Sequence, residues 1–275
     1  MSTVPIALTF AGSDSSGGAG IQADLKTFSA LGAYGASVLT ALTAQNTRGV
    51  QAIHDVPPAF VTAQMDSVFT DLCVRATKIG MLSRPGIIEA VADGLERHGA
   101  RGVVLDPVMV ATSGDRLISE EAVAALRSRL MPLADLVTPN LPEAAALLDD
   151  AIADGEEAAV AQGRRLIALG AKAVLIKGGH AGGDESSDLL VQPDTVRRFP
   201  ARREATANTH GTGCTLSAAV AAGLAHGQAL GDAVAAAKAY VTEAIRAGDR
   251  LSVGRGSGPV HHFHRWWPER APARP

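Results

Sequence analysis

Short apolar runs with β-strand character alternate with amphipathic helical patterns along most of this chain, and no other feature restricts its fold as strongly. Residues 6–10 form the first buried apolar run, and apolar side chains at helical spacing follow over residues 21–31 until Gly32 ends the pattern. Strand–helix units that repeat in this way predict a mostly parallel sheet covered by helices on both faces. Ligands of such folds bind beyond the carboxyl ends of the strands, so polar residues at those ends are the first candidates for a site.

The remaining elements continue this alternation. Further strands are expected at residues 37–42, 77–80, 102–105, 136–138 and 173–177. Helices are expected at 60–72, 87–95, 119–130, 212–225 and 232–247. Two more helices are expected between these, one that begins at residue 142 and a following one that ends at residue 169. Residues 189–191 and 196–199 are expected to form a small hairpin at a sheet edge. The 275 residues carry no composition shift strong enough to mark a boundary, so we expect one domain over 1–275, with the acidic segment 149–157 as a surface loop.

Composition excludes several classes of function. The net charge is −3 and the body of the chain holds no basic run, so a nucleic-acid footprint is not expected. Two cysteines far apart exclude a disulfide framework and a multi-cysteine zinc site, and they favour a reducing compartment, the cytoplasm. The first residues lack the pattern of a signal peptide, and no apolar stretch approaches the length that spans a membrane. A membrane partner is therefore not expected.

A first glycine-rich loop, residues 11–20, lies between a predicted strand and a predicted helix. Residues 18–23 formally match the dinucleotide-binding pattern, but the acid expected about 20 residues later is replaced by Gln45 and Asn46. No Gly-Lys-Ser/Thr follows, which excludes a P-loop. The run of polar residues 13–16 favours a polar ligand-binding loop, and the alternative is a tight turn that closes the strand onto the helix.

A second glycine-rich loop, residues 208–216, precedes an Ala-rich helical run. Gly211, Thr212 and Gly213 would turn backbone amides inward at a helix N-terminus, where partial positive charge favours a phosphoryl group. The alternative is a helix cap made by Thr209 or Thr212. Cys214 is either a small buried residue or, with its pKa lowered by the helix terminus, a base or nucleophile.

Carboxylates and an amide follow two of the predicted strands. Asp106 ends one strand, and Asn140 and Glu143 lie where the next strand passes into a helix. Oxygen ligands of this kind suit Mg²⁺, which usually binds one or two carboxylates together with substrate phosphates. The alternatives are a turn-initiating Asp-Pro and an acid that stabilises the first turn of a helix. Their occurrence beside an anion-binding loop favours the magnesium interpretation.

Two lysines and the end of the chain are less informative. Lys177 ends another strand and could contact phosphate or simply extend to solvent at the sheet rim, and Lys238 within a helix is more often solvated. The three histidines in residues 261–264 suggest a metal site, but neighbouring side chains diverge and no acidic partner is near. We favour a tail, 258–275, packed on the body or on a partner subunit through Phe263, Trp266 and Trp267.

These motifs together resemble the ribokinase-like superfamily, and most closely the hydroxymethylpyrimidine/phosphomethylpyrimidine kinases of thiamine biosynthesis. The resembling segments occur in family order over nearly the whole chain: residues 11–24, 43–47, 78–81, 106–109, 138–143, 177–180, 210–214 and 258–262. The resemblance implies a three-layer α/β/α sandwich with a mostly parallel central sheet, a homodimer, and phosphorylation first of the hydroxymethyl group and then of the resulting monophosphate.

The resemblance also implies roles for individual residues. The pyrimidine would be held by Gln45 and Asp24, near Gly12, Met81 and Val108. ATP would lie over Gly211–Cys214, with cofactor contacts from Lys177, Asn140, Thr209 and Lys238. Mg²⁺ would be bound near Asp106 and Glu143.

One position separates this chain from most sugar kinases of the superfamily, which usually carry aspartate where this chain has Cys214. The pyrimidine kinases resemble this chain in having cysteine there, and we predict that Cys214 takes the proton of the substrate hydroxyl. Two alternatives stay open at this point: a kinase of a pyridoxal-type pyridine alcohol, and a non-catalytic protein that binds a pyrimidine.

Overall fold

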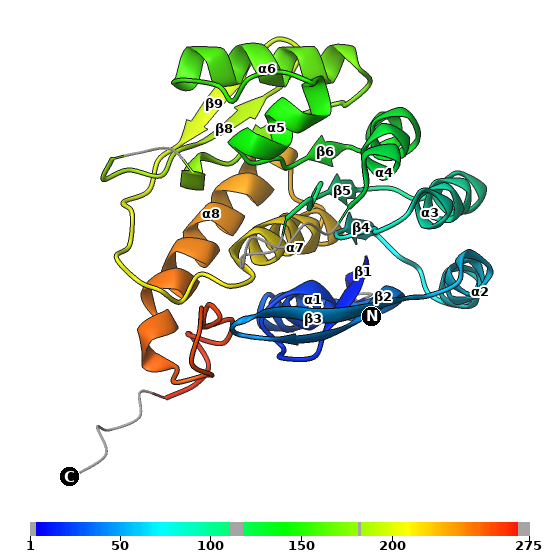
Figure 1. The fold of residues 1–275 in the computed structure, drawn as a ribbon, viewed down its shortest axis with the longest axis horizontal. Coiled ribbons are helices and arrows are strands. Elements are labelled where there is room, and N and C mark those ends of the chain that lie inside the picture. The colour runs from blue at the N-terminus through cyan, green and yellow to red at the C-terminus, as the bar shows by residue number, and fades with distance from the viewer. Residues whose placement is uncertain (1–3, 111–117, 181–182, 269–275) are drawn as a thin grey trace.

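A nine-stranded sheet runs through the computed structural model, which describes residues 4–110, 118–180 and 183–268 (Figure 1). The strand order is β3-β2-β1-β4-β5-β6-β7-β8-β9. Six central strands are parallel: β2 (Tyr34–Asn46), β1 (Ile6–Asp14), β4 (Ala76–Ile79), β5 (Val103–Leu105), β6 (Leu136–Val137) and β7 (Val174–Ile176). Antiparallel strands flank them: β3 (Gly49–Asp55) on one side, β8 (Asp188–Val191) and β9 (Val196–Phe199) on the other. The predicted parallel sheet and edge hairpin are confirmed.

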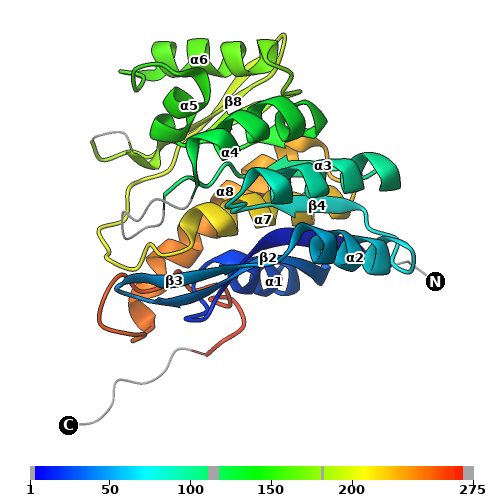
Figure 2. The same cartoon turned by 45° about the vertical axis from the view of Figure 1, so that its right-hand side comes forward.

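Helices cover both faces of the sheet, as the apolar strands require. One layer contains α2 (Pro58–Phe69), α3 (Pro85–His98), α4 (Glu120–Ala125), α5 (Leu141–Leu148) and α6 (Glu156–Ala168). The opposite layer contains α1 (Gly20–Ala30), α7 (Thr212–Ala225) and α8 (Leu230–Arg246). Successive strand residues face opposite layers: Leu105 packs in the first core and Val104 in the second. Figure 2 shows the two helical layers on either side of the strands.

Short turns of other helix types complete the element list. The helix expected over 119–130 is α4 continued by a π-helical turn, Leu126–Leu130, and a 3₁₀ turn, Met131–Leu133. Two further 3₁₀ turns span Gly178–His180 and Gly248–Arg250. Of the acidic segment 149–157, predicted as a surface loop, residues 149–155 form the connection between α5 and α6, and Glu156 and Glu157 begin α6.

The N-terminal end of α7 reaches the carboxyl ends of the central strands because α7 runs through the interior. Its residues 215–223 are all buried, so it packs against the sheet and against α8 at once. Small side chains make this possible: a Cβ added at Gly223 would come within 2.9 Å of the Ala233 Cβ on α8. Close packing of this kind holds the glycine loop that precedes α7 in a fixed position.

One hairpin was not predicted. The strand expected at 37–42 extends from Tyr34 to Asn46 and returns as β3, so β2 and β3 form an antiparallel ribbon beside the predicted site. Beyond Ala41 the ribbon leaves the helical layers, and most of its side chains are partly or fully exposed. The sequence there lacks the continuous apolar run by which buried strands are identified.

The described part of the C-terminal tail, residues 258–268, packs on the body of the molecule. Pro259 pairs with His210, Val260 is fully buried, and the carbonyl oxygen of His262 accepts a hydrogen bond of 2.6 Å from the Tyr240 hydroxyl. Trp266 and Trp267 are largely exposed, so the packing expected through these two rings is made mostly by residues before them. Residues 269–275 lie outside the described residues.

Candidate active site

A cavity of about 740 Å³ opens at the carboxyl ends of the parallel strands, where the strand pattern places a ligand. It is bounded by the first glycine loop, the β2–β3 ribbon, the second glycine loop and α8. Of the fifteen residues predicted for the site, fourteen line this cavity: Gly12, Gln45, Met81, Asp106, Val108, Asn140, Glu143, Lys177, Thr209, Gly211, Thr212, Gly213, Cys214 and Lys238. The two glycine loops, 196 residues apart in sequence at Asp14 and His210, therefore face one space.

The second glycine loop presents the N-terminus of a long helix to the cavity. α7 begins at Thr212, and its N-cap Gly211 has a φ of 80°, in the left-handed region that favours glycine. A cap from a threonine side chain was the alternative expectation, but the Thr212 hydroxyl donates to the carbonyl oxygen of Thr209 at 2.7 Å. No side chain caps the start of α7, although the Thr212 amide also donates to the Thr209 carbonyl oxygen at 3.2 Å, and the helix terminus favours an anion there.

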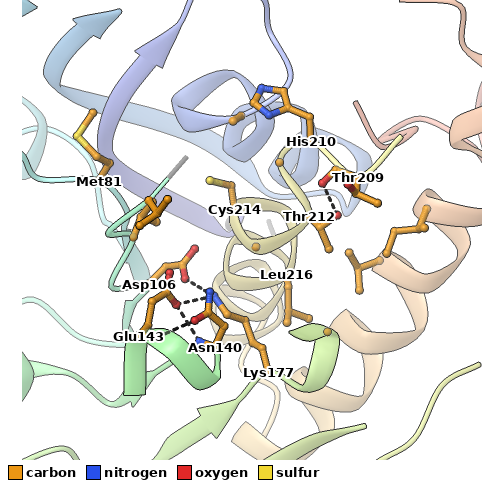
Figure 3. Close-up of a pocket in the computed structure, with 18 of the residues that line it drawn as sticks. Met81, Asp106, Asn140, Glu143, Lys177, Thr209, His210, Thr212, Cys214 and Leu216 are labelled. Carbon is orange, nitrogen blue, oxygen red and sulfur yellow. Dashed lines mark hydrogen bonds and ion pairs between the residues drawn. The ribbon is translucent and has the colours of Figure 1, made fainter. Parts of the chain in front are cut away.

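A lysine and two carboxylates meet directly below this helix terminus. Lys177 Nζ lies 2.7 Å from Asp106 Oδ1 and 3.5 Å from Glu143 Oε2. Asp106 also accepts hydrogen bonds from the hydroxyls of Thr138 and Ser217. Figure 3 shows the Asp106, Glu143 and Lys177 side chains joined in this group, with Cys214 between it and His210 in the view. The anion loop and the carboxylates therefore serve the same part of the cavity.

The two carboxylates differ in their electrostatic surroundings. Although burial opposes ionisation, Lys177 and Lys78 hold the pKa of Asp106 below its ordinary value. Burial raises the pKa of Glu143, and Lys177, more distant from it, offsets this only in part. Glu143 is therefore the acid that a further positive charge would stabilise, since the lysine it shares lies nearer to Asp106 and Asp106 has Lys78 as well.

Glu143 and Asn140 also have a local structural role. The Asn140 side chain accepts from the Glu143 amide, and Glu143 Oε2 accepts from the Asn140 amide, both at 2.8 Å. This is a capping box at the start of α5. The structure therefore contains the helix cap that was the alternative interpretation of Glu143. The same carboxylate also lies at the cavity wall, and the cap fixes its position there.

The donor set fits a magnesium ion that shares its coordination with phosphate. Within the described ranges, no group of three or more His, Cys, Asp or Glu side chains could hold a metal by itself. Asp106 and Glu143 are hard oxygen donors that share Lys177. Mg²⁺ commonly takes only one or two carboxylates and completes its octahedron with water and substrate phosphates.

Cys214 lies in the first turn of α7, half-buried and facing the cavity. The expectation that the helix terminus lowers its pKa is wrong in direction. Burial raises the pKa of the thiol to about 11, and the stabilising effects of Lys78 and of a hydrogen bond from the Gly20 amide do not overcome it. Two carboxylates, Asp24 and Asp106, add to the cost of a thiolate.

Asp24 is the one predicted residue that the structure places outside the cavity wall. It is fully buried in α1, where its Oδ2 lies 2.9 Å from Lys78 Nζ and accepts a 2.6 Å hydrogen bond from Thr9. The expected contact between Asp24 and a pyrimidine is therefore corrected: the carboxylate neutralises a lysine behind the cavity. Although burial opposes the charge, Asp24 raises the pKa of Lys78 above its ordinary value.

Lys238 also differs from its expectation as a solvated side chain. It is buried on α8, and its ammonium group lies 2.9 Å from Asp188 Oδ2. The other oxygen of Asp188 accepts from the Gly178 amide at 2.9 Å. Asp188 was not predicted as part of the site, although a charged residue at the start of an otherwise apolar strand is a usable signal.

On the other side of the cavity, Gln45 and Met81 are held by neighbours that the sequence partly indicated. A Cβ added at Gly12 would lie 2.9 Å from Met81 Cε, so glycine at this position makes room for the methionine. The Gln45 backbone is fixed to Ser15, whose hydroxyl donates to the Gln45 carbonyl oxygen at 2.8 Å. Asp14 and His210, which were not assigned roles, are joined by a buried hydrogen bond at the same wall, with 2.9 Å between Oδ2 and Nε2.

Comparisons with known proteins agree with this arrangement. Residues 14–261 match the family model described as phosphomethylpyrimidine kinase. A hydroxymethylpyrimidine/phosphomethylpyrimidine kinase of Rhizobium meliloti is 63% identical over 262 residues, which cover 95% of this chain and 98% of that protein.

Solved structures are similar as well. A crystal structure of phosphomethylpyrimidine kinase from Clostridium difficile has a TM-score of 0.79 at 44% identity, covering 88% of this chain and 100% of that one. The pyridoxal kinase of Staphylococcus aureus in complex with AMP-PCP and pyridoxal has a TM-score of 0.88 at 33% identity, covering 96% and 95%.

Proposed function

This chain belongs to the phosphomethylpyrimidine kinase family, and from that premise we propose the reaction and the roles of its residues. It is a kinase that transfers the terminal phosphoryl group of ATP to 4-amino-5-hydroxymethyl-2-methylpyrimidine and then to the resulting monophosphate, in thiamine biosynthesis. A single kinase domain, residues 1–275, carries out both phosphorylations.

A single observation carries this proposal. The cavity that contains the Gln45 amide is also the cavity into which the Gly211–Cys214 loop opens, and His210 Nε2 at the start of that loop lies 3.5 Å from Gln45 Nε2. An amide that can both donate and accept suits an aminopyrimidine edge. A helix N-terminus suits the migrating phosphoryl group. The two requirements of a pyrimidine kinase are thus met side by side.

Binding and orientation of the nucleotide fall to residues on the far side of the cavity. We assign the β- and γ-phosphates to the amides of Gly211, Thr212 and Gly213 and to the ammonium of Lys177. Phosphoryl transfer depends mainly on positioning and on stabilising charge over the phosphoryl oxygens. Lys238, Asn140 and Thr209 are assigned to the remainder of the ATP molecule and to the water around it.

A magnesium ion would be held near Asp106 and Glu143. When bound, it neutralises phosphate charge and fixes the phosphate relative to the acceptor alcohol. The support from this chain is the local charge: Lys177 cannot satisfy both acids, since it lies closer to Asp106 than to Glu143 by 0.8 Å, the difference between 2.7 and 3.5 Å.

The pyrimidine is assigned to the wall formed by Gln45, Gly12, Met81 and Val108, with its hydroxymethyl group towards Cys214. We assign the thiolate of Cys214 to take the hydroxyl proton. Because burial raises the pKa of the thiol to about 11, the thiolate is scarce at neutral pH, so it contributes less than the positioning of the phosphate.

Two further properties belong to the proposal. We place the protein in the cytoplasm, because Cys73 is exposed as a free thiol, which a reducing compartment preserves. None of the helices described here is both long and apolar enough to span a membrane. We also propose a homodimer, supported by the position of β3 at the edge of the sheet and by exposed Leu42 and Ile53 on the same ribbon.

Product identification tests the proposal. Protein, ATP and magnesium are incubated with hydroxymethylaminopyrimidine, with its monophosphate and, in parallel, with pyridoxine, and the products are identified by mass spectrometry. The monophosphate and the diphosphate of the pyrimidine are expected, formed faster than pyridoxine phosphate. Binding of the pyrimidine without any phosphate transfer would instead support a non-catalytic protein.

A further inference from the structure

The two glycine loops touch each other where His210 lies. A Cβ added at Gly18 would come within 2.3 Å of His210 Cδ2, and one added at Gly211 within 1.9 Å of the Gly18 carbonyl oxygen. The two loops are packed so closely that neither glycine could carry even a methyl group without a shift of its neighbour. His210 is thus fixed between the first loop, the β2–β3 ribbon and the anion loop.

The proton on His210 Nε2 follows from its partner. Asp14 Oδ2 lies 2.9 Å from Nε2 and accepts from the Gly18 and Ala19 amides at 3.0 and 2.8 Å. Although burial opposes ionisation, hydrogen bonds from His210 and Ser16 hold the pKa of Asp14 well below its ordinary value. A carboxylate has no proton to donate, so Nε2 must carry a hydrogen and donate it.

The orientation of the Gln45 amide follows from the same reasoning. Thr43 Oγ1 lies 2.9 Å from the Ser13 carbonyl oxygen and 3.0 Å from one end of the Gln45 amide. The carbonyl oxygen can only accept, so it takes the single hydroxyl hydrogen of Thr43, and the amide end beside Thr43 must then be the donating NH₂ group. The oxygen end is left facing the N–H of His210, 3.5 Å away.

The opposite orientation, with the amide nitrogen towards His210, would place two donors against each other. It would also give the single hydroxyl hydrogen of Thr43 two acceptors, the Ser13 carbonyl oxygen and the Gln45 amide oxygen. The two ends of an amide have nearly the same shape, so partners decide which end is oxygen. Exchanging them removes the contact between two donors and leaves the Thr43 hydrogen with one acceptor. The His210 N–H keeps Asp14 as its nearer acceptor, at 2.9 Å, and the Gln45 oxygen is a second, more distant one at 3.5 Å.

We propose that His210, held by Asp14, is a positioning residue that sets the direction of the Gln45 amide and thereby selects heterocycles by the order of donor and acceptor on their edge. This inference rests on the proposed function. With oxygen on the His210 side and NH₂ on the Thr43 side, Gln45 pairs with a ring that places an exocyclic amino group towards His210 and a ring nitrogen towards Thr43. A ring with an oxo group in place of the amino group presents an acceptor to an acceptor and is rejected.

The test compares affinities for hydroxymethylaminopyrimidine and for its 4-oxo analogue, by calorimetry without ATP. His210→Phe keeps a ring of similar size over Gly18 and removes the N–H. It is expected to weaken binding of the amino compound roughly three- to tenfold, because the long, shared contact that orients the Gln45 amide is lost, and to reduce the preference over the oxo analogue by a similar factor. His210→Gln, which can place an N–H near the same point, is expected to restore most of that preference.

A double-mutant cycle separates positioning from general damage. In a Gln45→Met background, His210→Phe is expected to change the affinity by less than about twofold, because the amide through which it acts is absent. Equal weakening in both backgrounds, or an unchanged amino-to-oxo preference in His210→Phe, would overturn the inference. His226→Phe, at a histidine bonded to the Leu31 carbonyl oxygen on the other side of the molecule, is the matched control with no expected effect.

Two further outcomes are decisive. If His210→Phe does not fold, Thr43→Val removes the other anchor of the amide and is expected to lower the same preference; an unchanged preference in Thr43→Val would again contradict the inference. If the wild-type protein neither binds nor phosphorylates the aminopyrimidine, the proposed function fails as well. If the wild type turns over the aminopyrimidine normally but the effects of His210→Phe and Gln45→Met on affinity are additive, this inference fails and the proposed function stands.

Discussion

Lys177 Nζ lies 2.7 Å from Asp106 Oδ1, in an ion pair at the ends of two strands that are separated in the sheet by β6. The same ammonium group is 3.5 Å from Glu143, so one lysine serves two buried acids unequally. A Cβ added at Gly213 would lie 3.5 Å from this ammonium group, which places the group directly beneath the anion loop. The acids therefore hold the lysine beneath the phosphoryl site and also leave negative charge for a second cation.

The first prediction concerns magnesium. Glu143→Gln keeps a residue that can cap α5 but removes the charge, so the fold should change little. The magnesium concentration that gives half-maximal rate is expected to rise about tenfold or more, since a buried oxygen ligand loses its charge. Titration of the rate with magnesium at saturating ATP measures this. Asp194→Asn in the β8–β9 turn is the control, and an unchanged magnesium requirement in Glu143→Gln would contradict the assignment.

The second prediction concerns Cys214 and pH. Because burial raises the pKa of this thiol to about 11, the thiolate fraction grows about tenfold for each pH unit below that value. If the thiolate takes the substrate proton, kcat/KM for the pyrimidine should rise through pH 7–9. Cys214→Ser is expected to abolish this rise and, like Cys214→Ala, to lower turnover by about 10²–10⁴ while pyrimidine binding stays within about threefold. The same pH profile and turnover in Cys214→Ala would exclude the cysteine as base.

The rim residues could be predicted from sequence because the geometry of a parallel sheet is restrictive. Asp106, Asn140 and Lys177 follow three consecutive strands of the sheet order, β5, β6 and β7, and parallel strands end at one edge. Knowing only that each residue ends a strand was enough to bring all three to one cavity. Helix α7 was equally predictable, since its small residues and preceding glycines define both its start and its packing.

Pairings between distant side chains could not be predicted. Asp14 and His210 are 196 residues apart, and no periodicity records that one faces the other. The β2–β3 ribbon was missed for a related reason: it leaves the helical layers, so its side chains carry no buried pattern. Cys214 was placed correctly, but the direction of its pKa depended on how much water the surrounding loops exclude, which a motif does not contain.

The third prediction concerns the dimer. Leu42 is 45% exposed on the β2–β3 ribbon, next to the edge strand β3. If two copies associate through this ribbon, Leu42→Lys should convert the dimer to a monomer in light scattering at micromolar concentration, because a desolvated ammonium group opposes association. Ile152→Lys, at an apolar residue between α5 and α6 that is 59% exposed, should leave the mass unchanged. A monomeric wild-type protein would contradict the homodimer.

The fourth prediction separates a structural role of Asp24 from the substrate contact that the family resemblance implies. The Asp24–Lys78 pair is fully buried, with 2.9 Å between the charged groups, so removing one partner leaves the other as an unpaired buried charge. Asp24→Ala is expected to lower the free energy of unfolding by about 3–5 kcal/mol in urea titrations.

Glu243→Ala, which breaks an exposed pair with Arg246, should cost less than about 1 kcal/mol. Replacing both buried partners, as in Asp24→Leu with Lys78→Met, should recover much of the loss, because two apolar side chains of similar size need no counter-charge. If Asp24→Ala were as stable as the wild type but bound the pyrimidine weakly, the carboxylate would be acting on the substrate, and its placement behind the cavity would be wrong.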